Sequence, residues 1–129
     1  MIIEFRRKNL AGQFSGHDLP LIRIEKPVGR VVIYKKAADL LGLKDGDAVM
    51  FSGDRAKSKL YIYKEIPKKD SYIAKIADTT RPYFRFTSKQ LVVDLCDFLS
   101  LKFNKESVYL ELNPVQDEQG RFQLTNRSI

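Results

Sequence analysis

The 129-residue chain contains one cysteine and one histidine and no tryptophan. The single thiol, Cys96, cannot form an intramolecular disulfide. Its position in an apolar pattern beside Leu95 and Leu99 predicts a packed side chain and not a reactive one. One histidine, His17, without cysteine partners does not make a zinc site. The residue types therefore indicate neither a metal nor a cofactor, and we expect none.

The chain also lacks the signals of a membrane span, an exported protein or a catalytic centre. No apolar run approaches the roughly 18 residues of a transmembrane helix, and the first residues have no apolar core followed by a small-residue cleavage site. There is no glycine-rich phosphate loop and no Ser-His-Asp grouping, and Asp39, Asp45 and Asp47 lie where helix and turn chemistry explains them. We therefore expect a cytoplasmic protein that is not an enzyme and does not bind membranes.

Positive charge is in excess and unevenly distributed. The formal net charge is +7, from 23 Lys and Arg against 16 Asp and Glu. Residues 1–81 hold 17 basic and 10 acidic residues, whereas residues 82–129 hold 6 of each. Attraction to phosphate depends on local potential, so this distribution predicts one face that meets a polyanion and another that meets protein. The alternative is that lysine-rich loops only keep the protein soluble.

The stretch Gly29–Phe51 predicts a strand, a short helix, a turn and a second strand. A β-branched run over residues 31–33 favours the first strand, and apolar residues between Ala37 and Leu43 recur at helical spacing. The Asp45-Gly46 pair predicts the turn that ends the helix, because both residues tolerate positive φ angles. The second strand is expected at Ala48–Phe51.

Alternation of apolar and polar residues predicts further strands around this stretch. Leu21–Glu25 is one of them. Leu60–Lys64 should pair with Ala48–Phe51 as a hairpin around a polar turn. Ser71–Ala77 fits a short strand or a helical turn about equally, and we take it as a strand. Residues 2–6 predict a strand that leads into Arg6-Arg7-Lys8, which is either a solvated strand end or an arm that folds onto nucleic acid.

Residues 83–129 repeat the pattern of the central unit. With a shift of 58 residues, residues 39–44 align with residues 97–102, and one inserted residue, Phe103, restores the match further on. The same order of elements follows. The expected elements are a strand at Tyr83–Phe86, an N-cap at Ser88, a helix at Lys89–Leu101, and a hairpin of Val108–Leu112 with Arg121–Leu124.

Four segments result: an N-terminal strand and basic arm (1–20), a first unit (21–66), a linker (67–82, with the boundary at Thr79–Pro82) and a degenerate second unit (83–129). We expect them to form one compact domain. One strand-helix-hairpin unit cannot close its own sheet, so the second copy would supply the missing partner and give a pseudo-twofold β-barrel. Chance similarity of the two units is the alternative.

The first unit carries a spaced set of residues in one ungapped register: Arg23-Ile24-Glu25, Gly29-Arg30-Val31-Val32-Ile33, Lys35, Leu41-Gly42-Leu43 and Gly46-Asp47. This set resembles the DNA-binding module of AbrB-like (SpoVT/AbrB, swapped-hairpin) regulators. The resemblance implies a mainly β fold with short helices, in which duplicated β-α-β-β units form an AbrB-like, cradle-loop β-barrel. The family usually has Pro where this chain has Tyr34, and commonly Arg where it has Ala38.

By this resemblance the chain is expected to be a small nucleic-acid-binding protein, an AbrB-like DNA-binding transcriptional regulator. Arg23, Arg30 and Lys35 would face the DNA. Charge alone adds Lys36 and the basic residues of the polar turn. Arginine would fork onto phosphates or base edges, while the lysines would act as point charges. The added turn residues are Arg55, Lys57 and Lys59.

Three alternatives remain open. Tyr34, Tyr61 and Tyr63 interleave with lysines, so single-stranded nucleic acid is a variant of the same function unless these tyrosines pack on the barrel. The missing helix arginine at Ala38 favours a different class, a structural or assembly module of a phage or mobile element that binds protein and not DNA. Pairing of two chains as a homodimer is compatible with either function.

Overall fold

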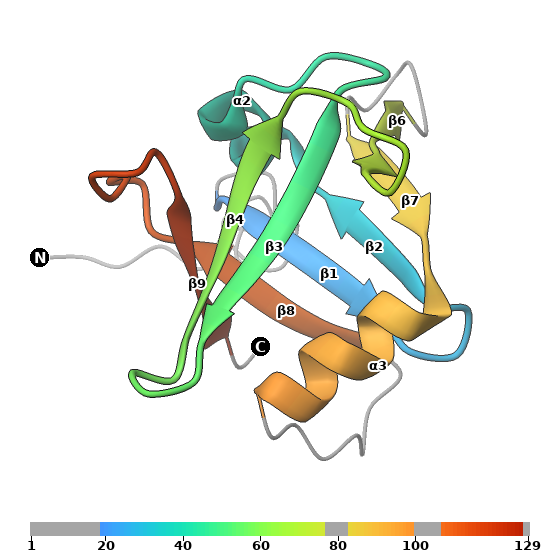
Figure 1. Cartoon of the computed structure of the whole chain (residues 1–129). Helices are drawn as coiled ribbons and strands as arrows, with labels where there is room; N and C mark the ends of the chain where they lie inside the picture. The colour runs from blue at the N-terminus through green and yellow to red at the C-terminus, as the bar shows by residue number, and fades with distance from the viewer. Residues whose placement is uncertain (1–18, 77–82, 100–106, 128–129) are drawn as a thin grey trace, which may run out of the picture.

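The computed structural model describes residues 19–76, 83–99 and 107–127, and in this part of the chain nine strands and two short helices are present (Figure 1). The expectation of a mainly β protein is confirmed. The elements are β1 (Leu21–Glu25), β2 (Arg30–Ile33), α2 (Lys35–Leu41), β3 (Ala48–Asp54), β4 (Lys59–Glu65), β5 (Tyr72–Ile73), β6 (Lys75–Ile76), β7 (Phe84–Thr87), α3 (Lys89–Phe98), β8 (Ser107–Leu112) and β9 (Phe122–Arg127).

All these strands form one antiparallel sheet that curls into a nearly closed barrel. Its order is β5-β3-β4-β9-β8-β1-β2-β7-β6. The two edge strands, β5 and β6, are separated in sequence only by Ala74, so the two ends of the sheet meet at this residue. The Ala74 side chain is fully buried, its N–H donates to the Asp47 carbonyl at 2.8 Å, and its carbonyl accepts from the Gly46 N–H at 2.9 Å. The strand expected at Ser71–Ala77 is thus confirmed as two short pieces, within the segment expected to be a linker.

Helix α2 ends earlier than the sequence pattern predicts. Gly42 follows its last turn with φ 68°, and the Leu43 N–H donates to the Ala38 carbonyl at 3.0 Å. A left-handed glycine after the last turn is a common helix terminator. The prediction that Asp45-Gly46 ends the helix was therefore wrong, because apolar spacing continues through Leu43 after the helical backbone has stopped. The pair forms the turn into β3 instead, with Gly46 at φ 89°.

Helix α3 begins as predicted and ends before the expected residue. The Ser88 hydroxyl accepts a hydrogen bond from the Leu91 N–H at 3.2 Å, which satisfies one of the free N–H groups of the first turn. The helix ends at Phe98 and not at Leu101. Both expected hairpins are confirmed, β3 with β4 and β8 with β9.

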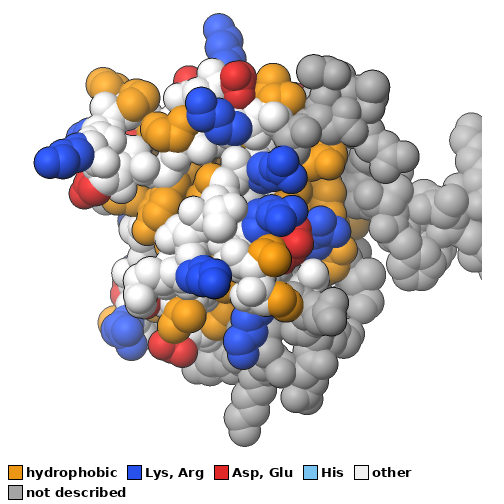
Figure 2. Space-filling model, turned by 90° about the vertical axis from the view of Figure 1, so that its right-hand side faces the viewer, with side chains coloured by type: hydrophobic (Ala, Val, Ile, Leu, Met, Phe, Trp, Pro, Cys, Tyr) orange, Lys and Arg blue, Asp and Glu red, His pale blue; other side chains and the backbone are white. Residues whose placement is uncertain are grey.

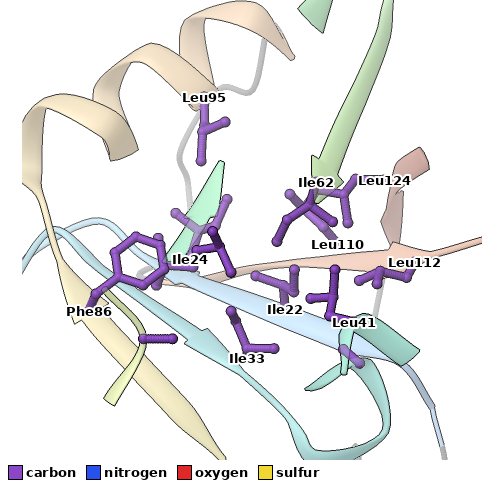
Figure 3. Close-up of a cluster of buried hydrophobic side chains, with 14 of the residues drawn as sticks. Ile22, Ile24, Ile33, Leu41, Ile62, Phe86, Leu95, Leu110, Leu112 and Leu124 are labelled. Carbon is purple, nitrogen blue, oxygen red and sulfur yellow. The ribbon is translucent and has the colours of Figure 1, made fainter. Parts of the chain in front are cut away.

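The core lies between the inner face of the barrel and the two helices. Alternating residues of the strands point inward, as period-2 patterning predicts, and Figure 3 shows them meeting side chains of α2 and α3. Cys96 belongs to this core at 7% exposure, and burial raises the pKa of its thiol to about 11, so the expectation of a packed thiol is confirmed. The labelled core residues are Ile22, Ile24, Ile33, Leu41, Ile62, Phe86, Leu95, Leu110, Leu112 and Leu124.

Some sequence expectations fall outside the described residues. These are the strand at residues 2–6, the basic triplet Arg6-Arg7-Lys8, His17, the boundary at Thr79–Pro82 and the inserted Phe103.

Candidate nucleic-acid interface

The register of four neighbouring strands places basic residues in rows on the outer face of the barrel. β7 shows how the sequence produces this arrangement: Phe84 and Phe86 are buried, while Arg85 and Thr87 between and after them are exposed. Residues that lie directly opposite each other on neighbouring strands share a face. One row therefore consists of Arg23, Val32, Arg85 and Lys75 on β1, β2, β7 and β6. The next row contains Glu25, Arg30 and Thr87 on β1, β2 and β7.

The start of α3 lies against the same part of the sheet. The Ser88 N–H donates to the Gly29 carbonyl at 2.7 Å. A Cβ built on Gly29 would come within 2.5 Å of Lys89 Cγ, so the first residue of the helix packs directly on the turn before Arg30. Four basic side chains thus gather at one place although they come from three strands and a helix. We call Arg30, Lys75, Arg85 and Lys89 the cationic face.

None of the four side chains of the cationic face has an ion pair or hydrogen bond among residues 19–76, 83–99 and 107–127. Lys75, Arg85 and Lys89 are exposed and Arg30 is partly exposed. Figure 2 shows the side of the molecule that carries β6 and β7, where Lys and Arg side chains gather on the described surface with some acidic side chains among them.

Two features of the cationic face oppose folding stability. Lys75 lies directly opposite Arg85, and like charges in such a pair destabilise a sheet. Lys89 occupies the first position of α3, whose first turn has no acidic residue, although helix dipoles favour negative charge there. Charges that cost stability and lack partners among the described residues are typical of a surface that binds an anion.

Arg23 lies in the same row but is already engaged. Its guanidinium donates to the Glu25 carboxylate at 3.0 Å and lies 5.9 Å from the centre of the Tyr34 ring. Tyr34 stacks on Tyr109 with ring centres 6.5 Å apart and meets Tyr83 edge-on at 6.3 Å. Burial raises the pKa of Tyr34 to about 12. Of the three interleaved tyrosines, Tyr34 is therefore packed, and Tyr61 is buried at 9% exposure with Arg121 4.1 Å from its ring centre, whereas Tyr63 is partly buried.

The other basic residues selected from the sequence lie elsewhere. Lys35 and Lys36 begin α2 at the far end of β2 from Arg30, and Arg55, Lys57 and Lys59 lie at the turn between β3 and β4. In Figure 1, α2 and this turn are at opposite ends of the barrel. The structure therefore brings together Arg23 and Arg30 and separates Arg30 from the remaining five. Lys35 directly follows Tyr34, on whose ring the Arg23 guanidinium lies.

Sequence reasoning missed Lys75, Arg85 and Lys89. The alternation FRFT at residues 84–87 is the signal for Arg85, because it places that side chain on the wet face of a strand. No sequence signal gives the register that sets Arg85 beside Lys75, or the contact between Gly29 and Lys89.

The nearby carboxylates have structural roles. Asp45 accepts a hydrogen bond from the Ile76 N–H at 2.8 Å and so holds the end of β6. Asp47 accepts from the Lys44 N–H at 2.8 Å and lies 3.7 Å from Lys64 Nζ. Within the described ranges no group of three or more His, Cys, Asp or Glu could hold a metal ion.

A groove of about 550 Å³ lies beside α2, lined by Leu40, Leu112, Pro114 and neighbouring residues. Its walls are mainly aliphatic, with Lys36 and Glu111 at the rim. In the described part of the chain, no helix is long and apolar enough to cross a membrane.

A scan with protein-family models and searches of curated proteins and of solved structures find no match to this chain. Functional conclusions for this protein therefore rest on its own residues and their geometry.

Proposed function

We propose that the protein is a small DNA-binding protein of the AbrB-like kind and that it acts in the cytoplasm as a regulator of transcription. The observation that carries the proposal is the cationic face, where four basic side chains lie together without an ion pair among the described residues. Glu25 lies directly opposite Arg30, but its carboxylate is paired with Arg23. A polyanion would supply the missing negative charge. Duplex DNA carries about one charge per 1.7 Å of its axis, so it presents a dense row of phosphates to such a face.

The pairing order supports the duplicated architecture that goes with this proposal. β1 pairs with β2 and β8, and the continuous segment 72–76 pairs with β7 and β3. β4 pairs with β9. If each element of one unit is exchanged with its counterpart in the other unit, the order in which the strands pair is unchanged. The counterparts are β1 and 72–76, β2 and β7, α2 and α3, β3 and β8, and β4 and β9. We propose that the second unit begins at β5, so that each unit is strand, strand, helix and hairpin.

A salt titration tests the function. Binding of a fluorescent DNA duplex should weaken linearly on a log-log plot against salt, with a slope of about −3 to −4 for four phosphate contacts. Arg30→Ala should reduce the slope by about 0.9. Lys35→Ala tests the DNA contact that the family resemblance implies for Lys35, which lies at the other end of β2 from Arg30. If the protein binds no duplex even at low salt, binding of double-stranded DNA is refuted.

A second candidate is a protein-assembly module. The observation that favours it is the burial of Ala38, a core residue of α2 with 3% exposure. The AbrB-like family commonly has Arg at this position, whereas the buried Ala38 side chain cannot contact a ligand. Exposed aliphatic side chains at Ile66 and Val115 are available for protein contacts. Size-exclusion chromatography with light scattering separates the two candidates, because stable assembly without salt-sensitive DNA affinity supports only the second.

A further inference from the structure

We infer that the cationic face lies along the sugar-phosphate backbone of double-stranded DNA without reading its bases, and that residues after the first unit supply most of the contacts. This inference rests on the proposed DNA-binding function and goes beyond it by naming the surface, the form of the DNA and the mode of recognition. The contacts assigned here are Lys75, Arg85 and Lys89, together with Arg30.

The spacing of the four residues suits a backbone contact. Arg30 lies opposite Thr87, so Arg85 is its diagonal neighbour, at a Cα distance of roughly 7–8 Å. β2, β7 and β6 lie about 4.8 Å apart, so the face spans about 10 Å across the strands. Lys89 extends it beyond the end of β7. Such a short, dense row of cations can neutralise several phosphates at once.

The elements that could enter a groove argue against base reading. A protein reads bases in the major groove by inserting a helix or a two-stranded ribbon. The exposed side of α3 carries Val93, Asp94 and Asp97, and its carboxylates would be repelled by the phosphates at the groove edges. The cationic face itself lies on β2, β7, β6 and the start of α3, where it meets the DNA as a surface and not as an inserted element.

The aromatic side chains beside the face argue against single strands. Proteins that bind single-stranded DNA stack bases on exposed aromatic rings next to a cationic groove. Here Tyr34 stacks on Tyr109, touches Tyr83 edge-on and lies under Arg23. All three rings are partly buried and pack on one another, so they offer less open ring surface to a base than the exposed aromatic rings of single-strand binders.

The test compares two variants of the full chain with equal net charge. The face variant carries Lys75→Gln, Arg85→Gln and Lys89→Gln. The turn variant carries Arg55→Gln, Lys57→Gln and Lys59→Gln. Each removes three positive charges, which lowers the formal net charge from +7 to +4. The probes are two 20-base-pair duplexes of unrelated sequence and one 20-nucleotide single strand.

We expect the slope of log affinity against log salt to fall by about 2.7 in the face variant, or about 0.9 for each removed cation, and by less than 1 in the turn variant. Wild-type protein should bind the two duplexes within threefold of each other and the single strand more weakly. Equal losses in the two variants would mean that only net charge matters and would overturn the assignment. A tenfold preference for one duplex, or for the single strand, would overturn backbone recognition of the duplex.

Failure of the proposed function gives a different result, because wild-type protein would then bind none of the probes. A stability measurement keeps the assignment testable if the face variant folds poorly. Lys75→Glu replaces the like-charge opposition to Arg85 with an attraction, so its urea midpoint should rise while duplex affinity falls. A lower midpoint with unchanged affinity would show that Lys75 only supports the fold and would refute its role in binding.

Discussion

Gly29 should be the glycine that tolerates replacement least. It has φ +65°, and a Cβ there would lie 2.7 Å from Lys89 Cα and 2.9 Å from Lys89 N, which are backbone atoms of the other unit. A left-handed conformation costs a non-glycine residue about 1–2 kcal/mol. Overpacking against atoms that cannot rotate away costs about 1–3 kcal/mol more. We therefore expect Gly29→Ala to lower the free energy of unfolding by about 2–5 kcal/mol.

Gly46→Ala is the matched control. Gly46 also has a positive φ, +89°, but nothing lies within 4 Å of the position of its Cβ. Its replacement should cost only the conformational part, about 1–2 kcal/mol. Urea unfolding followed by circular dichroism, with linear extrapolation, gives both values. If the two substitutions cost the same within about 0.5 kcal/mol, the close approach of Gly29 to Lys89 is not what makes glycine necessary.

Three other residues give separate predictions. Gly53→Ala should cost about 1–3 kcal/mol, because its Cβ would come within 2.5 Å of the Phe98 ring, and Phe98→Leu in the same chain should recover part of that loss in urea unfolding. Asp117 accepts a hydrogen bond from the Arg121 N–H, which lowers the pKa of its carboxyl below the ordinary value. A lowered pKa stabilises the folded state above the unfolded-state pKa, and this contribution is lost as pH falls through the folded-state value. Asp117→Asn should therefore reduce the urea midpoint at neutral pH and make no difference in strong acid; equal midpoints at neutral pH would contradict this. Burial raises the pKa of Cys96 to about 11, so the thiol should react with a disulfide reagent only as fast as the protein unfolds, and rapid labelling of native protein would contradict the packing.

The local features of this fold could be predicted from sequence because each depends on a few neighbouring residues. Alternation gave the strands at Leu21–Glu25 and in both hairpins, and Ser88 marked the start of α3. The closure of the barrel depends on the hydrogen bonds of Ala74, whose partners lie 27 and 28 residues earlier in the chain. No local pattern encodes contacts at that separation.

Charge counted along the chain was a poor guide to charge on the surface. Residues 82–129 are neutral as a group, yet Arg85 and Lys89 belong to the cationic face. Three described acidic residues of the same segment lie elsewhere. Asp94 and Asp97 are on the outer side of α3, and Asp117 is bound to Arg121 in the loop before β9. An average over a segment therefore cancels charges that the fold separates.

The row of Arg23, Val32, Arg85 and Lys75 on the outer face suggests why two units fused in one chain could take different roles in binding. In the proposed duplication the exchange of units maps Arg23 onto Lys75 and Val32 onto Arg85, so the two outer positions of the row are equivalent to each other, as are the two inner positions. Basic residues at both outer positions preserve the symmetry, whereas the inner positions hold a valine with 2% exposure and an exposed arginine. In a homodimer of two identical units, both inner positions would hold the same residue, because both would come from the same position in the sequence. A single chain can keep Val32 as packing under its neighbours and use Arg85 for phosphate, which would concentrate binding on one side of the pseudo-twofold axis.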